Sequence, residues 1–150
     1  MMTEGSAISN QSSIAKLPLL AAIIALIGVA DSVYLTVKHF TAEPVPCSLI
    51  SGCETVLTSS YAEIGGIPLA ALGALAYFAA FSLALLAAFG SRLMWSLFGA
   101  QVIIMALVTL WLTYLQAFVI GAFCQFCLLS AATTTLLLLI FIISRFFSRN

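Results

Sequence analysis

Four long runs of apolar residues alternate with short polar segments along the chain. They cover residues 17–40, 67–89, 93–118 and 123–147, and the second and third runs contain no charged residue. Each run meets the roughly 20 residues that a helix needs to cross about 30 Å of hydrocarbon. Because four spans cannot close a β-barrel, the pattern predicts four transmembrane helices.

The connections between these runs differ in length. Residues 41–66 form one long loop, residues 90–92 a tight hairpin, and residues 119–122 a turn. Short connections make neighbouring helices antiparallel, so we expect an all-α integral membrane protein built as a four-helix bundle with one long external loop. We expect residues 1–16 to be disordered and residues 148–150 to form a short tail.

Composition supports a membrane location. The chain has 150 residues, of which 63% are hydrophobic and 7% charged, and its net charge is zero. A soluble domain carries about a quarter charged residues. The chain also lacks the basic patch that nucleic-acid binding requires, so nucleic acid is excluded as a partner.

The basic residues predict the orientation of the bundle. In a four-span arrangement Lys16, Arg92, Arg145 and Arg149 lie on one side, and Lys38 lies near the other. The positive-inside rule places the richer side in the cytoplasm. We therefore expect a cytoplasmic (inner) membrane protein with both termini inside and the long loop outside.

The first apolar run admits a second interpretation. Lys16, the apolar residues after it, and the small pair Gly28 and Ala30 also resemble a signal peptide cleaved before Asp31. The apolar pattern continues to Val37, which favours an uncleaved span.

A carboxyl inside a span is by default a functional candidate. Asp31 is therefore either functional or a structural residue that hydrogen-bonds Tyr34 or Thr113, and the sequence does not separate the two. An alternative class of function follows from the first option: a small transporter or membrane assembly subunit, with Asp31 as its ion site and structural disulfides.

Two cysteine pairs carry the clearest chemical signal. Cys47 and Cys53 lie in the long loop, and Cys124 and Cys127 form a CxxC motif at the start of the fourth run. The chain crosses the membrane twice between the pairs, so both return to the same face. The charge pattern makes that face the outer one, where disulfides persist.

Three roles for the four cysteines were weighed. A zinc site is disfavoured by the five-residue gap in the loop pair and by the nearness of lipid, so no metal is expected. Purely structural disulfides explain little, because a Cys47–Cys53 bond closes a short ring and removes little unfolded-state entropy. Thiol–disulfide exchange between the pairs requires one movable pair, and Gly52 beside Cys53 predicts a mobile turn.

The position of the CxxC motif suits redox chemistry. Cys124 is expected in the first helical turn, where unpaired N–H groups and the helix dipole favour a thiolate. Cys127 lies one turn deeper, toward the lipid. An electron acceptor at that depth must be lipid-soluble, which indicates a membrane quinone such as menaquinone or ubiquinone.

The chain resembles a known family in the run "CSLISGCETVLTSSYAEIGGIPLAALGALAY" followed by CxxC at the start of the last helix. This order of loop pair, serine, Gly-Ile-Pro and terminal CxxC is similar to the vitamin K epoxide reductase family, and most similar to its bacterial, disulfide-forming members. The resemblance covers about residues 17–145. The enterobacterial four-helix thiol oxidase uses a similar pair of cysteine motifs, but it places its CxxC in the first external loop. The order of the motifs in this chain therefore argues against that protein.

The resemblance implies a role for each cysteine. Cys124 and Cys127 are the implied active-site pair, with Cys127 facing the quinone. Cys47 and Cys53 are the implied shuttle pair. Cys53 would exchange with Cys124, and Cys47 would meet a thioredoxin-like partner on the external side.

Other positions match or depart from the family. Ser59 matches a serine near the active site, and Val56, Leu57 and Tyr61 match a short amphipathic helix that covers the quinone pocket. Vertebrate members carry a tyrosine four residues after the CxxC, where this chain has Ala131. The departure favours disulfide generation over epoxide reduction. No thioredoxin domain is fused to the sequence, so the partner is expected to be a separate protein.

Overall fold

The computed structural model describes the backbone of residues 2–150 and the side chains of residues 16–150. Within this part of the chain, four helical segments are long and apolar enough to cross a membrane. They are built from α1 (Met2–Thr41), α3 (Leu69–Ala88), α4 (Arg92–Tyr114) with its π-helical extension η1 (Leu115–Ile120), and α5 (Gln125–Arg149). The predicted all-α, four-span fold is confirmed.

The first helix starts earlier than expected. Its backbone is helical from Met2, whereas the side chains of residues 1–15 lie outside the described residues, so the disorder expected for residues 1–16 stays a prediction. A formed helix adds one hydrogen bond for each further residue it orders, so an apolar span can propagate into a polar flank. The apolar part of α1 runs over Lys16–Thr41, close to the expected span.

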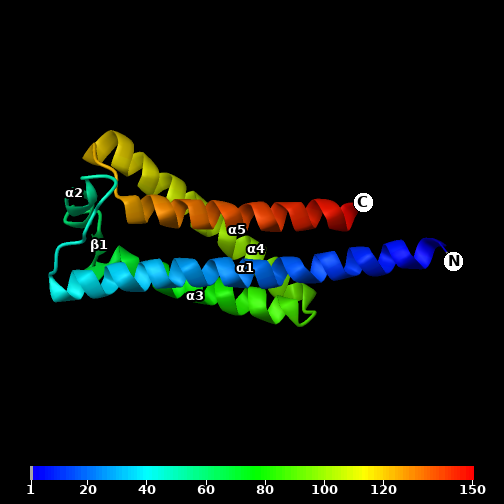
Figure 1. Ribbon diagram of the computed structural model, residues 1–150. Helices are drawn as coiled ribbons and strands as arrows, with labels where there is room; N and C mark the ends of the chain where they lie inside the picture. Colours follow the sequence, from blue (N-terminus) through cyan, green and yellow to red (C-terminus); the bar gives the residue numbers. More distant parts are fainter. Residues whose placement is uncertain (1) are drawn as a thin grey trace.

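The four helices form a bundle in which α1 and α4 each pack against both α3 and α5. Both termini lie at one end, and the long loop with α2 lies at the other (Figure 1). Small residues allow α1 and α3 to approach closely, since Ala25, Ala80 and Ala84 are fully buried. A Cβ added at Gly28 would come 2.3 Å from the ring of Tyr77, so a larger residue would push these helices apart.

Large apolar side chains also cover the outside of the bundle. Leu75 on α3 and Leu107 and Leu110 on α4 are more than 60% exposed. Contiguous exposed apolar surface on this scale is unfavourable in water. It is the surface that a bundle presents to hydrocarbon, which agrees with the membrane location.

The long loop contains three short elements. Helix α2 (Cys53–Leu57) is the short helix that the resemblance implied, and it contains Val56 and Leu57. Tyr61 was expected in the same helix, but it lies after the end of α2, as does Ser59. Strands β1 (Glu63–Ile64) and β2 (Ile67–Pro68) pair antiparallel, with Ile64 opposite Ile67. Gly65 and Gly66 both have positive φ, as a two-residue hairpin turn of this kind requires.

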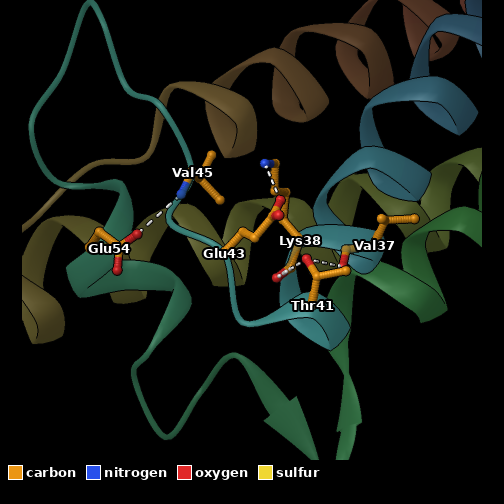
Figure 2. Close-up of polar contacts among 6 residues, drawn as sticks. All are labelled: Val37, Lys38, Thr41, Glu43, Val45 and Glu54. Atoms are coloured by element: carbon orange, nitrogen blue, oxygen red, sulfur yellow. Dashed lines mark hydrogen bonds and ion pairs between the residues drawn. The ribbon is translucent and has the colours of Figure 1, made fainter.

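Two polar contacts hold the long loop in place at the C-terminal end of α1 (Figure 2). Nζ of Lys38 pairs with Glu43 at 2.8 Å, and the backbone N–H of Val45 donates to Oε1 of Glu54 at 3.1 Å. The second contact joins the segment before Cys47 to α2, which begins at Cys53. The two halves of the loop pair are therefore held together by more than their own sulfur atoms.

Candidate redox site

All four cysteines meet in one apolar cluster at the loop end of the bundle. Cys53 and Cys124 are almost completely buried there with Val56, and Cys47 and Cys127 pack against them. The prediction that both pairs return to the same face is confirmed. Residues far apart in the sequence are thus brought within reach of sulfur exchange.

The two pairs differ in redox state. Cys47 and Cys53 form a disulfide with a Cα–Cα distance of 6.3 Å, whereas Cys124 and Cys127 are free thiols. Exchange requires a thiolate beside a disulfide. The cluster provides that pairing, with one oxidised and one reduced pair in contact through shared apolar neighbours.

The loop is seated against the start of α5 at two points. A Cβ added at Gly52 would lie 2.5 Å from the carbonyl oxygen of Phe123, so glycine is needed for this close approach. The backbone N–H of Leu49 donates to Oε1 of Gln125 at 3.0 Å. Gly52 occupies a tight contact in this structure, and the mobile turn expected at it stays a prediction.

Cys124 was expected in the first turn of α5. In the structure it is the N-cap, one residue before the helix begins. Its backbone is extended, with φ −107° and ψ 126°, and its carbonyl accepts from the N–H of Leu128 at 3.0 Å. Its own N–H donates to Oε1 of Gln116 at 3.2 Å. An extended residue followed at once by helix is the usual N-cap arrangement.

Gln116 belongs to the π-helix η1, which the sequence did not predict. It is 5% exposed, and its backbone carbonyl accepts from the N–H of Ala122. The side chain and the backbone of one residue therefore both hold the turn that leads into Cys124. Widened helical turns of this type are frequent at functional sites.

The electrostatic surroundings favour a thiolate at Cys124, which precedes the span of α5. Hydrogen bonding by the Cys127 side chain lowers the pKa of the Cys124 thiol below its usual range. The N–H groups of Cys127 and Phe126 act in the same direction, whereas burial and the charge of Asp31 oppose it. The net direction is downward, so Cys124 has the character of a nucleophile.

A cavity of about 910 Å³ lies beside the cysteine cluster and is lined mainly by apolar side chains. Cys127 is part of its wall, whereas Cys53 and Cys124 are buried outside it. All the positions expected at a quinone site line this cavity: Val56, Leu57, Ser59, Tyr61 and Cys127. Its size and apolar lining suit a small lipid-soluble ligand such as a quinone ring.

Polar groups occupy two parts of the cavity wall. The hydroxyl of Tyr77 lies 2.8 Å from the hydroxyl of Ser130 and 2.7 Å from that of Thr134, and all three residues line the cavity. Tyr77 was not predicted as a site residue. Its phenol brings a hydroxyl to the cavity from α3, whereas Ala131 on α5 offers none.

The other polar part lies where α1 meets the loop. Lys38 and Glu43 form an ion pair at 2.8 Å, and Nε2 of His39 lies 3.0 Å from Oε1 of Glu63. All four line the cavity. Ser59 contributes little polarity, because its hydroxyl donates to the carbonyl of Val56 at 2.7 Å.

Metal binding has no visible site in the described part of the chain. No group of three or more His, Cys, Asp or Glu side chains there is arranged to hold an ion. The reactive groups that the described residues bring together are cysteine sulfurs next to an apolar cavity.

The chain was compared with models of known protein families. The model of the "Vitamin K epoxide reductase family" matches residues 19–142. This range is most of the chain and contains both cysteine pairs and the named residues of the cavity wall.

Proposed function

The chain belongs to the vitamin K epoxide reductase family of membrane disulfide oxidoreductases, and from that premise we propose that it generates disulfides for a thioredoxin-like partner and delivers the electrons to a membrane quinone. The observation that carries this proposal is the single cluster of four cysteines, with Cys127 on the wall of an apolar cavity. Such an arrangement links a loop disulfide on one side to a lipid-soluble acceptor on the other.

The exposure of the loop pair supports the order of transfer. Cys47 is half-buried, whereas Cys53 is 1% exposed and shares its apolar surroundings with Cys124. The partner's dithiol would reduce the Cys47–Cys53 disulfide through Cys47. Cys53 would then attack the Cys124–Cys127 disulfide, which re-forms the loop disulfide and leaves two thiols at CxxC. The structure corresponds to the state after this internal transfer.

Leu49 supports a docking position for the partner beside Cys47. Its side chain is 85% exposed although it lies next to a buried cysteine cluster. An exposed apolar side chain beside a reactive disulfide suits recognition of an extended, apolar segment around a partner's cysteine. We infer that the partner lies on the outer face.

The cavity would hold the quinone against Cys127. A bound quinone supplies an acceptor for two electrons and two protons. Val56 and Leu57 of α2 would cover it from the loop side, and Tyr77, Ser130 and Thr134 would offer it hydroxyl groups. Closure by α2 would keep water from Cys127 while the pair is oxidised.

We place the cysteine cluster outside the cytoplasmic membrane on the charge bias. Both termini lie at one end of the bundle and the long loop at the other (Figure 1). By their order along the chain, Lys16, Arg92, Arg145 and Arg149 fall on the side of the termini. In intact cells, an impermeant maleimide should label reduced Cys47, the more exposed cysteine of the loop pair, from outside. Labelling that requires permeabilised membranes would reverse the orientation.

The test of the proposed function is anaerobic quinone reduction. Purified protein in lipid discs, supplied with a reduced thioredoxin-like donor and a short-chain quinone, should form quinol in proportion to donor disulfide. A protein with all four cysteines replaced by alanine is the control. No quinol above that control would refute the proposal.

A further inference from the structure

Asp31 lies within the apolar part of α1 and has no partner. It is 7% exposed, and neither carboxyl oxygen has a hydrogen-bond partner among the described side chains. The structural role considered for it, a hydrogen bond to Tyr34 or Thr113, is therefore not found. An unpaired carboxylate away from water is costly, so the group gains by holding a proton. Asp31 makes no hydrogen bond that would stabilise the fold, which points to a chemical role.

The neighbours of Asp31 on α1 show which way it faces. Gly28, one turn before it, lies against the ring of Tyr77 on α3. Tyr34, nearly one turn after it, packs on Phe126 with 5.4 Å between ring centroids. Residues three apart share a helix face. Asp31 therefore faces the region between Tyr77 and the CxxC turn, which contains Phe126.

The opposite side of that region is a polar stripe on α5. Cys127, Ser130 and Thr134 follow one another at helical spacing, and all three line the cavity. Tyr77 joins the last two through its hydroxyl, which also donates to the carbonyl of Ser130 at 2.7 Å. Three hydroxyl groups with exchangeable protons are therefore joined through Tyr77 at the cavity wall, one turn of α5 beyond Cys127.

The titratable groups around Asp31 are few. From α5 and its N-cap they are Cys127 and Cys124, and from α3 it is Tyr77; the charge of Asp31 acts on all three. On its own helix the nearest are Tyr34 and Lys38, and Lys38 is already paired with Glu43. Asp31 is thus close enough for its charge, when it is ionised, to act on the reacting thiols and on a cavity hydroxyl, and no cation among the described residues is paired with it.

We propose that Asp31 carries a proton between the Cys124–Cys127 thiols and the hydroxyl groups of the cavity wall. The inference rests on the proposed function. Closing the disulfide removes two electrons and two protons from the pair. The Asp31 carboxyl gives its proton to the Tyr77 hydroxyl and regains one from the Cys127 thiol through water, because neither carboxyl oxygen hydrogen-bonds either group directly. The other proton leaves Cys124 for water when its thiolate forms, and water returns one to the cavity, so that two electrons and two protons reach the acceptor.

The test compares Asp31→Asn, which keeps the size but cannot exchange the proton, with Asp31→Glu, which keeps the carboxyl. Thr133→Val is the matched control, because Thr133 is a buried polar residue of α5 whose hydroxyl bonds only its own helix at Leu129. With dithiothreitol as donor, Asp31→Asn should reduce quinone about 100-fold more slowly. Asp31→Glu should recover most of that loss, and the control should match the wild type.

A second measurement needs no quinone. The infrared difference spectrum between dithiothreitol-reduced and diamide-oxidised protein should contain a protonated-carboxyl band that is absent in Asp31→Asn and unchanged in Thr133→Val. A wild-type spectrum without that band overturns the proposal even if Asp31→Asn is slow, because the loss would then reflect packing. Full turnover of Asp31→Asn also overturns it. If wild type reduces no quinone, the proposed function fails, and the spectrum still decides the role of Asp31.

Discussion

The backbone N–H of Leu49 donates a 3.0 Å hydrogen bond to Oε1 of Gln125, the residue that follows Cys124 in the CxxC motif. This contact joins the loop that carries the Cys47–Cys53 disulfide to the CxxC motif. It couples the two pairs through an amide side chain rather than through sulfur. Loop seating can therefore be altered without touching a cysteine.

Replacing Gln125 with alanine should loosen the loop. One hydrogen bond is lost, which costs about 1 kcal/mol, so we expect internal disulfide transfer to slow about fivefold. Gln125→Glu keeps an acceptor at the same position and should stay near the wild-type rate. Stopped-flow exchange with a reduced partner would measure both. If Gln125→Ala and the wild type transfer at the same rate, the contact does not hold the loop in place.

Replacing Gly52 with alanine should displace the loop more strongly. The new Cβ would meet the carbonyl oxygen of Phe123 at 2.5 Å, and a backbone atom cannot rotate away. Overpacking of this kind costs about 1–3 kcal/mol, and transfer from Cys53 to Cys124 should slow accordingly. Ser51→Ala, at the neighbouring exposed position, is the control. The rate of quinone reduction with the partner should fall in the first variant and not in the second.

The two ends of the relay should respond differently to small donors. Cys47→Ala should block turnover with a protein partner but spare quinone reduction by dithiothreitol, because a small dithiol can enter the cavity and reduce the CxxC disulfide at Cys127 without the shuttle. Cys127→Ala should stop both reactions. Parallel quinol assays with the two donors would measure this. Equal inactivation of both variants with dithiothreitol would mean that the proposed order is wrong.

Removing the deeper thiol should trap the exchange intermediate. Transfer between the pairs passes through a mixed disulfide, and Cys127 is placed to resolve it. Cys127→Ser should therefore accumulate a Cys53–Cys124 bond and raise the thermal midpoint, since closing a loop of about 70 residues contributes roughly 4 kcal/mol in the entropic account. Non-reducing peptide mapping would identify the linked fragments. A Cys47–Cys124 bond would exchange the roles of the two loop cysteines.

The pH dependence of Cys124 reactivity should depend on its neighbour. The thiolate is the reactive form, and hydrogen bonding by Cys127 lowers the pKa of Cys124, so alkylation should begin at a lower pH than the value of about 8.5 for an ordinary cysteine. Cys127→Ala removes the largest cause and should move the profile to higher pH. Cys127→Ser keeps a donor and should move it less. Iodoacetamide rates in a Cys47→Ala, Cys53→Ala background, read by mass spectrometry, would test the order.

The sequence by itself determined the membrane fold and singled out the two cysteine pairs that we propose to be reactive. Each span is decided locally, because every residue in hydrocarbon must be apolar or paired, and helix length is set by membrane thickness. Counting two crossings between the pairs was enough to place them on one face. The positions matched to the family, from Val56 to Tyr61, also lie where expected, around the cavity.

Only the tertiary structure decided how the pairs are brought together. The tight seat of Gly52 on Phe123 is an approach of two backbones, and no local pattern records it. The same holds for the amide contacts of Gln116 and Gln125, since an amide in a span indicates hydrogen bonding but not its partner. Asp31 has no hydrogen-bond partner because of the way in which the faces of α1, α3 and α5 pack together. Such features arise from packing between distant segments, and a sequence read along one dimension does not contain their distances.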